Sequence, residues 1–464
     1  MRPATASIRF PQGIFANLRN NLLEDLSKEA FALLFGKTER LGKSHIIKVV
    51  GVRYPGPADY EGRGQAHLRL KREYIYKLLV EMQRSGQANT IIDVHTHPFS
   101  KRGVAFSGVD DHDEITFHKW LTDTLGEEVY YASIVLSQTD YSARLWDRVG
   151  NQSLGEPARI KTQTTQERWL STDDRESFAG ASLEASNPKN GYLARSALAL
   201  GLDTLRQIMY NQSIAVIGVG GLGSVIAENL IHTGFQEVSL IDPDRVEITN
   251  LNRIVGAYYN DAIQNRLKVD VVKSHLKRIH PKAKVHAYAV GVEDEKVLPV
   301  LAHADWILVC TDSHLSRFTA QKIALRYGVP LISVGVNIQV ENGQISDMSG
   351  EVITARFGDG LCLNCLGRVN HTKIAAEQHK GEFLGNELIQ RGYVSGQDVK
   401  EPAVKTLNAI LGALTVEQLL NQYTQRQTHE SIQVYENNRN ACIYPDTASV
   451  RDRRLDCFHC SSFG

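Results

Sequence analysis

The stretch Ile214-Ala-Val-Ile-Gly-Val-Gly-Gly-Leu-Gly223 places a glycine-rich loop directly after an apolar run. The apolar run predicts a buried strand, and residues 223–233 predict a helix. Glycines at this junction allow a tight turn and let backbone N–H groups approach a phosphate, to which the helix N-terminus adds a favourable dipole. Asp242 ends the next predicted strand, 19 residues after Gly223, where a carboxylate can accept ribose hydroxyls. This context predicts a nucleotide-binding loop rather than a turn that only packs a helix on a strand.

Strand and helix patterns alternate throughout the C-terminal half of the chain, which predicts a Rossmann-like, doubly wound α/β domain over residues 191–464. Residues 1–150 mix both patterns and predict a second α/β domain with a mixed sheet. Residues 151–190 are polar and predict a linker. The predicted strands are 46–50, 91–94, 129–145, 214–217, 238–241, 306–309 and 330–334, and the predicted helices are 67–84, 223–233, 268–279 and 318–327.

Composition is typical of a globular protein of two or three domains, with 464 residues of which 42% are hydrophobic and 22% charged. The 52 Lys and Arg residues balance the 52 Asp and Glu residues, so no overall field favours nucleic acid or an anionic membrane. No apolar run approaches the roughly 20 residues of a membrane span. The N-terminus has no apolar signal-peptide core, and we therefore expect a cytoplasmic protein.

The segment after Asp242 argues against a dinucleotide-dependent dehydrogenase. Leu240-Ile-Asp-Pro-Asp-Arg-Val-Glu-Ile-Thr-Asn-Leu-Asn-Arg253 resembles the ThiF/MoeB family of ubiquitin-activating-type adenylyltransferases, in which D-x-D-x-V-x-x-x-N-L-x-R follows the second strand. The resemblance continues at Lys268, at the segment 310–317 and in two C-x-x-C pairs. It covers roughly residues 190–464, and the motifs occur in the family's order.

This resemblance implies a site for ATP and Mg²⁺. Asp242 would bind the ribose, and Asp312 would hold Mg²⁺ near the α-phosphate. Arg195 would reach the nucleotide of the partner subunit in a homodimer, although its neighbours differ from the family's R-Y-x-R-Q. Cations around the α-phosphate stabilise the charge that builds up when a carboxylate attacks, a role expected of Arg253 and Lys268. The other residues implied at the nucleotide are Gly218, Gly220, Gly221, Gly223, Asp244 and Asn250.

Four of the six cysteines form the pairs Cys362-Leu-Asn-Cys365 and Cys457-Phe-His-Cys460. Two such knuckles can close a tetrahedral Cys₄ site, the arrangement of structural zinc. That site would fasten the end of the chain to the C-terminal domain. Redox pairs or unligated thiols are the alternatives.

Many ubiquitin-activating-type enzymes carry a cysteine after the first C-x-x-C, on which the activated protein forms a thioester. Residues 368–441 of this chain contain no cysteine. Cys310 ends an apolar run and is expected to be packed, and Cys442 has no local sign of activation. We therefore expect an enzyme that stops at the acyl-adenylate or passes it to a separate thiol, with a thioester on Cys442 as the alternative.

A second chemical motif, His95-Thr-His-Pro98, follows the predicted strand 91–94. Histidines at i and i+2 on a strand point the same way, so both imidazoles can bind one ion. Asp110 can supply a third ligand and leave a fourth position for water. An open zinc site of this kind lowers the pKa of its water towards neutrality and generates a hydroxide nucleophile.

These residues resemble the JAMM (JAB/MPN) metalloprotease motif, E…H-x-H-P…S-x-x-D, over about residues 1–150. The resemblance implies that Glu29 is the general base and that Ser107 stabilises the oxyanion. Twelve residues separate His97 from Asp110 where the family usually has ten, and the extra pair falls in a predicted loop. Asp111 and Asp113 are alternative ligands. Packed histidines and a metal-free MPN-like scaffold are the other interpretations.

Together the two resemblances predict ATP-dependent adenylation of the C-terminal glycine of a ubiquitin-like protein, coupled to zinc-dependent cleavage of its precursors or conjugates. We expect a prokaryotic-type modifier pathway, for instance in antiphage defence, with a separate conjugating enzyme. One alternative is the activation and maturation of a sulfur-carrier protein for cofactor or siderophore biosynthesis, with a separate sulfurtransferase. The other is a non-enzymatic scaffold.

Overall fold

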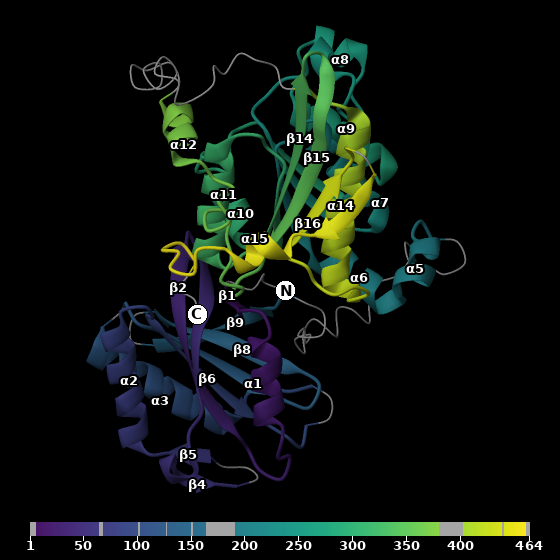
Figure 1. Cartoon of the computed structure of the whole chain (residues 1–464). Helices are drawn as coiled ribbons and strands as arrows, with labels where there is room; N and C mark the ends of the chain where they lie inside the picture. The colour runs from purple at the N-terminus through teal and green to yellow at the C-terminus, as the bar shows by residue number, and fades with distance from the viewer. Residues whose placement is uncertain are drawn as a thin grey trace. The chain divides into compact units, whose positions relative to one another are not determined.

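The computed structural model divides into two compact units, Met1–Ser182 and Leu183–Gly464 (Figure 1). The structure describes residues 6–64, 68–100, 103–126, 128–149, 152–163, 191–379, 402–438 and 440–460. Among these residues, no helix combines the length and apolarity that crossing a membrane requires.

The first unit is built on a closed, seven-stranded barrel of order β1-β3-β2-β6-β7-β8-β9, in which β9 pairs back to β1. Three neighbouring pairs are parallel (β1 with β3, β1 with β9, and β6 with β7) and the others are antiparallel, so the sheet is mixed as predicted. The strands are β1 (Ala6–Arg9), β2 (Phe31–Leu41), β3 (Ser44–Arg53), β6 (Thr90–Thr96), β7 (Tyr130–Leu136), β8 (Tyr141–Val149) and β9 (Gln152–Lys161). The helices are α1 (Ile14–Leu22), α2 (Arg72–Ser85) and α3 (Gly108–Leu125), and a small ribbon pairs β4 (Tyr60–Arg63) with β5 (Leu68–Leu70).

Strand β6 separates two apolar cores because successive side chains on a strand point to opposite faces. Ile92 and Val94 join the core that α1 covers. Ile91 joins the core that contains the apolar side chains of α2 and α3. Asp93 and His95 lie at the same parity as Ile91, so the sequence alternation directs both polar side chains towards α3.

Two boundaries of the first unit differ from the prediction. The helix expected over 67–84 begins at Arg72, because residues 68–70 form β5. The linker expected over 151–190 begins later, because Gln152–Lys161 forms β9 and pairs with both β8 and β1. Only Ala158 and Ile160 are buried apolar residues in that strand, so its polar composition concealed it. Residues 164–190 lie outside the described part.

The second unit is an eight-stranded sheet of order β12-β11-β10-β13-β14-β15-β16-β17. The first five strands run parallel, and the last three add antiparallel pairs. The strands are β10 (Ser213–Ile217), β11 (Glu237–Ile241), β12 (Lys284–Tyr288), β13 (Trp306–Val309), β14 (Leu331–Glu341), β15 (Gln344–Ala355), β16 (Ile432–Glu436) and β17 (Cys442–Pro445). The parallel part confirms the predicted Rossmann-like sheet.

Helices cover both faces of this sheet: α7, α9 and α14 lie on one face and α10 and α11 on the other (Figure 1). The helices are α5 (Ala194–Leu200), α6 (Leu202–Asn211), α7 (Gly221–Thr233), α8 (Tyr259–Ile263), α9 (Lys268–Ile279), α10 (Leu298–His303), α11 (His314–Tyr327), α12 (His371–Gln378), α14 (Lys405–Thr424) and α15 (Thr447–Arg451). The strands β10, β11 and β13 are almost wholly buried, as expected of a parallel sheet covered on both sides.

Candidate nucleotide and metal sites

The glycine loop connects β10 to α7 and touches the loop after β13. Gly218 has a φ of 84°, and a Cβ at this residue would lie 3.0 Å from the backbone nitrogen of Thr311. A Cβ at Gly223 would lie 1.8 Å from the carbonyl oxygen of Gly218. Backbone packing therefore requires glycine at both positions. Among the described residues, no atom lies within 4 Å of a Cβ built at Gly220, so this glycine leaves open space beside the loop.

The loop sits where the strand order reverses. Strand β11 lies on one side of β10, and the chain crosses over to place β13 on the other side. Ligands of open α/β sheets bind in the crevice at the carboxyl ends of the strands at such a switch point. The loops after β10 and β13 border that crevice, and the second of them carries Asp312.

Asp242, at the end of β11, is held by the glycine loop. Its Oδ2 accepts a 2.6 Å hydrogen bond from the Val219 N–H, and its Oδ1 accepts one of 2.9 Å from the Asp244 N–H. Burial raises the pKa of Asp242, while Lys268 and these backbone donors oppose that shift. Each carboxylate oxygen keeps a second lone pair with which to accept a ribose hydroxyl.

Lys268 begins α9 and forms an ion pair with Asp244, at 2.7 Å between Nζ and Oδ2. The Lys268 side chain is 13% exposed and the Asp244 side chain 63%. The ammonium group is therefore held at the end of β11 and partly shielded from water, which strengthens its interaction with an incoming phosphate.

Arg253 lies against the loop: a Cβ at Gly221 would approach its Cδ to 2.8 Å. The Arg253 guanidinium donates to the Thr249 carbonyl at 2.7 Å. Asn250 is buried, and its Oδ1 accepts from the Glu247 N–H at 3.2 Å. The same Cβ would approach the Asn408 amide nitrogen to 2.5 Å, so α14 also reaches the loop. The sequence analysis missed Asn408, which no motif marks.

Asp312 lies on the turn between β13 and α11, where the prediction places it, and its side chain is exposed. The turn is fixed on both sides of this residue: Arg317 Nε donates to the Thr311 carbonyl at 3.0 Å, and Ser313 caps α11. Arg195 is exposed on α5. Its contact with a partner subunit stays a prediction.

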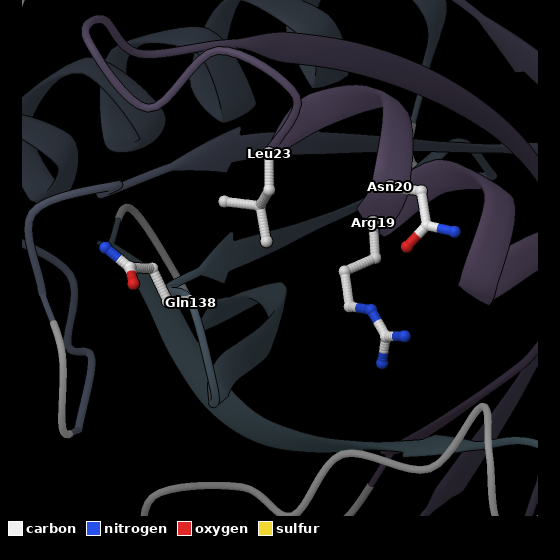
Figure 2. Close-up of a pocket in the computed structure, with 4 residues that line it drawn as sticks. All are labelled: Arg19, Asn20, Leu23 and Gln138. Atoms are coloured by element: carbon white, nitrogen blue, oxygen red, sulfur yellow. The ribbon is translucent and has the colours of Figure 1, made fainter.

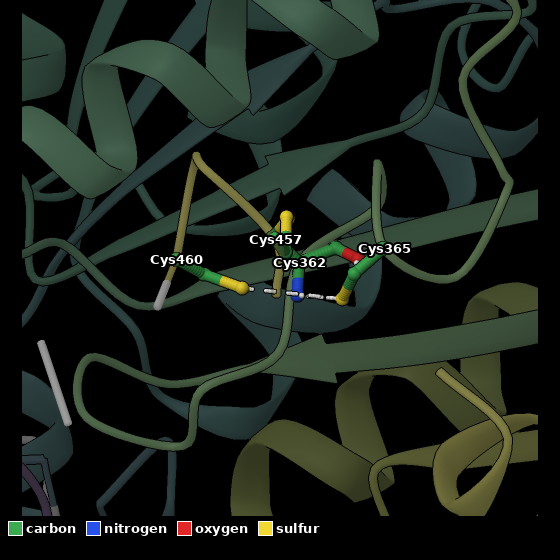
Figure 3. A group of neighbouring side chains, drawn as sticks. All are labelled: Cys362, Cys365, Cys457 and Cys460. Carbon is green, nitrogen blue, oxygen red and sulfur yellow. Dashed lines mark hydrogen bonds between the residues drawn. The ribbon is translucent and has the colours of Figure 1, made fainter. Parts of the chain in front are cut away.

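The four paired cysteines come together and are buried (Figure 3). The Sγ atoms of Cys362 and Cys457 are 3.7 Å apart, and those of Cys365 and Cys460 are 4.0 Å apart. A tetrahedral zinc ion with Zn–S bonds of about 2.3 Å separates its sulfurs by about 3.8 Å, whereas a disulfide requires about 2 Å. The geometry fits a structural zinc ion.

The other two thiols differ in their surroundings. Burial raises the pKa of Cys310 to about 12, so this thiol stays protonated at neutral pH. Cys442 is exposed on β17. The positive charge of Arg317 opposes the shift in the pKa of Cys310 but does not outweigh burial.

We predict that Cys460→Ser removes one zinc ion per chain and lowers the unfolding midpoint of the second unit by more than about 5 °C, because structural zinc contributes folding free energy directly. Zinc content by mass spectrometry and thermal unfolding followed by calorimetry provide the measurements. Cys442→Ser is the matched control and should leave both values unchanged. Unchanged zinc content in Cys460→Ser would contradict the site.

In the first unit, His95, His97 and Asp110 form a second cluster of ligand atoms, all within 4.8 Å of one another. The Nε2 of His95 lies 3.4 Å from Asp110 Oδ1, and the Nε2 of His97 lies 3.6 Å from Asp110 Oδ2. The His95 Nε2 is buried without a hydrogen-bond partner. Two imidazole nitrogens and one carboxylate are the ligand set of an open zinc site, so these residues fit the predicted ion.

Glu29 lies two residues before β2, whose first residue, Phe31, pairs with His95. The Thr96 N–H donates to the Ala30 carbonyl at 3.1 Å, so the segment before β2 also contacts the strand of the histidines. The Glu29 N–H donates to the Gly64 carbonyl at 3.0 Å, and the Glu29 carbonyl accepts from Arg63 Nε at 2.6 Å. The role of Glu29 as the general base stays a prediction.

Ser107 and Asp110 form the capping box of α3. The Asp110 N–H donates to Ser107 Oγ at 3.2 Å, and the Ser107 N–H donates to Asp110 Oδ2 at 2.6 Å. The alternative ligands do not join the cluster: Asp111 pairs with Arg144, and Asp113 is exposed. The longer spacing from His97 to Asp110 therefore still brings Asp110 to both histidines.

The pKa values of His95 and Asp110 are shifted in opposite directions, so that both side chains are charged without an ion. Although burial opposes the shift, Asp110 and Asp93 raise the pKa of His95 to about 10. Burial also opposes the effect of His95 on Asp110, whose pKa is nonetheless well below its usual range. His95 is therefore protonated at neutral pH, and an ion must displace that proton.

We predict that zinc affinity at this cluster rises about tenfold per pH unit between about pH 6.5 and 8.5, because binding releases one proton from His95. Because the pKa of His95 in the folded protein, about 10, lies above the ordinary histidine value of 6.5, protonation stabilises the fold without the ion fully below pH 6.5. That stability is lost as the pH rises through about 10. Competition titrations with the four-cysteine site already filled would measure the slope. A flat affinity would contradict the prediction.

A buried polar network behind the cluster was not predicted. Asp93 lies 3.9 Å from the Nδ1 of His95 and accepts a hydrogen bond from Tyr131. Glu114, on α3, accepts from Arg144 and Trp146. Burial, reinforced by Asp93, raises the pKa of Glu114 to about 7. These residues are far apart in the sequence and match no motif.

A shallow pocket of about 400 Å³ also lies in the first unit. Figure 2 shows its lining residues, Arg19, Asn20, Leu23 and Gln138. The lining offers no carboxylate, imidazole or thiol. We therefore assign no chemistry to it.

The fold and the loop geometry of the second unit define a nucleotide-binding α/β protein with cations at the carboxyl ends of its strands. The chain belongs to the ThiF family, which it matches over residues 193–457. The first unit lies outside that match.

Several relatives are similar to part of the chain. The adenylyltransferase and sulfurtransferase UBA4 of Kluyveromyces lactis is 26% identical over 257 residues, covering 54% of this chain and 51% of that protein. The molybdopterin-synthase adenylyltransferase of Haemophilus influenzae is 33% identical over 144 residues, 31% of this chain and 58% of that protein. The tRNA threonylcarbamoyladenosine dehydratase of Bacillus subtilis is 33% identical over 141 residues, which cover 30% of this chain and 54% of that protein. The chain thus spans little more than half the length of these relatives.

Among solved structures, the microcin C7 biosynthetic enzyme MccB in complex with N-formylated MccA matches with a TM-score of 0.46 and 20% identity. The match covers 60% of this chain and 76% of that chain.

Proposed function

We propose that the second unit uses ATP and Mg²⁺ to adenylate the C-terminal carboxylate of a small sulfur-carrier or ubiquitin-like protein that ends in glycine. The observation that carries this proposal is the glycine loop at the switch point of a ThiF-family sheet. Lys268 and Arg253 support it, because both cations lie beside that loop or the adjoining strand end.

In the proposed reaction, a carboxylate oxygen of the carrier attacks the α-phosphorus of ATP. The bond between the α- and β-phosphates breaks, and pyrophosphate leaves with the bonding electron pair. Negative charge concentrates on the phosphates in the transition state, so Lys268 and Arg253 bind it more strongly than they bind the ground state. Asp312 would hold a Mg²⁺ ion, which would supply further positive charge there.

Sulfur transfer is the fate of the adenylate that we favour over conjugation. The names of two relatives describe a sulfurtransferase and a sulfur-carrier adenylyltransferase, the latter from Thermus thermophilus. Residues 368–441 contain no cysteine to form a thioester, and Cys310 is a partly buried, protonated thiol. The sulfur would then come from a protein outside this chain.

Exchange of labelled pyrophosphate into ATP tests the activity. We expect exchange that requires the carrier and disappears when the carrier's terminal glycine is deleted. Mass spectrometry of the carrier's C-terminus then separates a thiocarboxylate from a conjugate. Exchange without any carrier would exclude a protein substrate, and no exchange with any carrier would favour the scaffold alternative.

A second activity is proposed for the first unit, on the strength of the His95–His97–Asp110 geometry. A zinc ion bound there would supply a water of lowered pKa. Glu29 would take the proton of that water, and the Ser107 hydroxyl would donate to the oxyanion of the attacked peptide carbonyl. We propose that the substrate is a carrier extended beyond its glycine, so that cleavage exposes the carboxylate that the second unit adenylates.

Cleavage of such an extended carrier, followed by intact-mass spectrometry, tests this activity. A chelator should abolish cleavage, and zinc should restore it. Cleavage that survives removal of zinc from both sites would exclude a metal-dependent mechanism.

A further inference from the structure

Helix α3 carries Asp110 and is held by apolar and polar contacts on different turns. Its apolar contacts lie further along the helix, where Leu121 is buried and Phe117 and Leu125 pack against the same core. The buried residue nearest to Asp110 in the helix is the polar Glu114, one turn away. Polar contacts therefore hold the turn of α3 that directs Asp110 towards the two histidines.

Glu114 makes the densest of these contacts. Its Oε2 accepts from Arg144 Nε at 2.9 Å, from Trp146 Nε1 at 2.7 Å and from the Ser133 hydroxyl. Arg144 also pairs with Asp111 on the same helix, at 2.5 Å. Its guanidinium stacks on the Phe106 ring at 3.7 Å and fixes the residue directly before Ser107.

The side chains around Glu114 come from a row of directly paired residues on three neighbouring strands. Asp93 on β6 pairs with Ser133 on β7, which pairs with Arg144 on β8. His95 is two residues along β6 from Asp93 and points to the same face. Asp93, at one end of this row, is therefore only two positions along β6 from His95, the first histidine ligand. We call the contacts of Glu114 with this row the anchor of α3.

Asp110 and Glu114 are one helical turn apart on one face of α3. We propose that Glu114, held by Arg144, is the positioning residue that directs Asp110 onto the metal cluster; this inference rests on the proposed zinc site. The anchor lies inside α3, so the length of the loop between His97 and Ser107 does not determine where Asp110 lies. This explains how a spacing two residues longer than the usual one keeps the ligand geometry.

Direct ligation by Glu114 is the competing role. Its free oxygen, Oε1, is buried without a hydrogen-bond partner, as is Oδ1 of Asp93, and these two residues and His95 have ligand atoms within 4.8 Å. A glutamine at position 114 separates the two roles. Its carbonyl still accepts from Trp146 and Arg144, but an amide is a poor substitute for a carboxylate ligand.

The test titrates Co²⁺ into the full-length chain after zinc has filled the four-cysteine site. Ligand-field bands without thiolate charge transfer report the histidine site. Glu114→Ala should bind Co²⁺ about 10- to 100-fold more weakly than the wild type, the range for losing an outer partner of a ligand. Glu114→Gln should stay within about threefold of the wild type, because the hydrogen bonds to the anchor persist.

His118→Ala is the matched control for stability. His118 is buried one turn further along α3 and hydrogen-bonds Ser153 at 2.9 Å. Its loss should lower the unfolding temperature and leave Co²⁺ affinity unchanged. Three results would overturn the inference: unchanged affinity in Glu114→Ala, equal weakening in Glu114→Gln, or equal weakening in His118→Ala. A wild type that binds no Co²⁺ at this site would instead refute the proposed zinc site.

Discussion

Asp312→Ala reduces carrier-dependent ATP–pyrophosphate exchange by at least about a hundredfold, the scale of losing one electrostatic contact to a transition state. Asp312 is exposed at the switch point and forms no ion pair among the described residues, so its removal leaves no buried group unsatisfied. The fold should therefore persist, and the loss should fall on kcat more than on the KM for ATP.

Two comparisons isolate this effect. Asp312→Asn keeps the shape of the side chain but not its charge. If the carboxylate binds Mg²⁺, this variant should be nearly as inactive as Asp312→Ala. Glu341→Ala removes an exposed carboxylate at the end of β14 and should exchange at the wild-type rate. Wild-type exchange in Asp312→Ala would refute the assignment of the adenylation site.

Glu29→Gln lowers cleavage of the extended carrier by at least about a hundredfold, since a general base contributes 10²- to 10⁴-fold. Glutamine cannot take the proton of the zinc-bound water. Because Glu29 is not one of the three clustered ligands, zinc content should stay at the wild-type value. Intact-mass spectrometry of the carrier follows the reaction.

Glu24→Gln provides the control, because this residue is exposed five positions earlier in the same segment. It should cleave at the wild-type rate. Loss of zinc in Glu29→Gln would show that Glu29 is a ligand, and full cleavage would place the base elsewhere. Neither variant should change pyrophosphate exchange with a carrier that already ends in glycine.

Local sequence patterns predicted four of the five parallel strands of the second unit, because these strands are short apolar runs. Strand β12 (Lys284–Tyr288) was missed, since polar and apolar residues mix in it. Helix α11 begins four residues earlier than predicted, at His314, since Ser313 acts as its N-cap. The added strands β15 to β17 were also missed: β15 and β17 pair with their chain neighbours β14 and β16, whereas the pairing of β15 with β16 joins segments that are distant in the chain. Asn408 was not predicted because it reaches Gly221 through a contact between segments that are distant in the chain, the packing of α14 on α7.

In the first unit, the period-2 alternation of β6 was enough to place His95 and His97 on one face. The motif named Asp110 as the third ligand, but the sequence could not show what holds Asp110 there, because the contacts between Glu114 and Arg144 join residues 30 apart in the chain. Strand β9 was missed because most of its side chains are polar.

The glycine loop contains glycines that folding requires and glycines that only nucleotide binding requires. A saturation-mutagenesis library would distinguish the two. At Gly223 every side chain collides with the Gly218 carbonyl, so even a library selected for folding alone should retain only glycine there. At Gly220 the surrounding space is open, so a folding selection should accept alanine or serine, while a selection for exchange activity should reject them. The ratio of the two enrichments at Gly220 would measure how closely the nucleotide approaches the backbone.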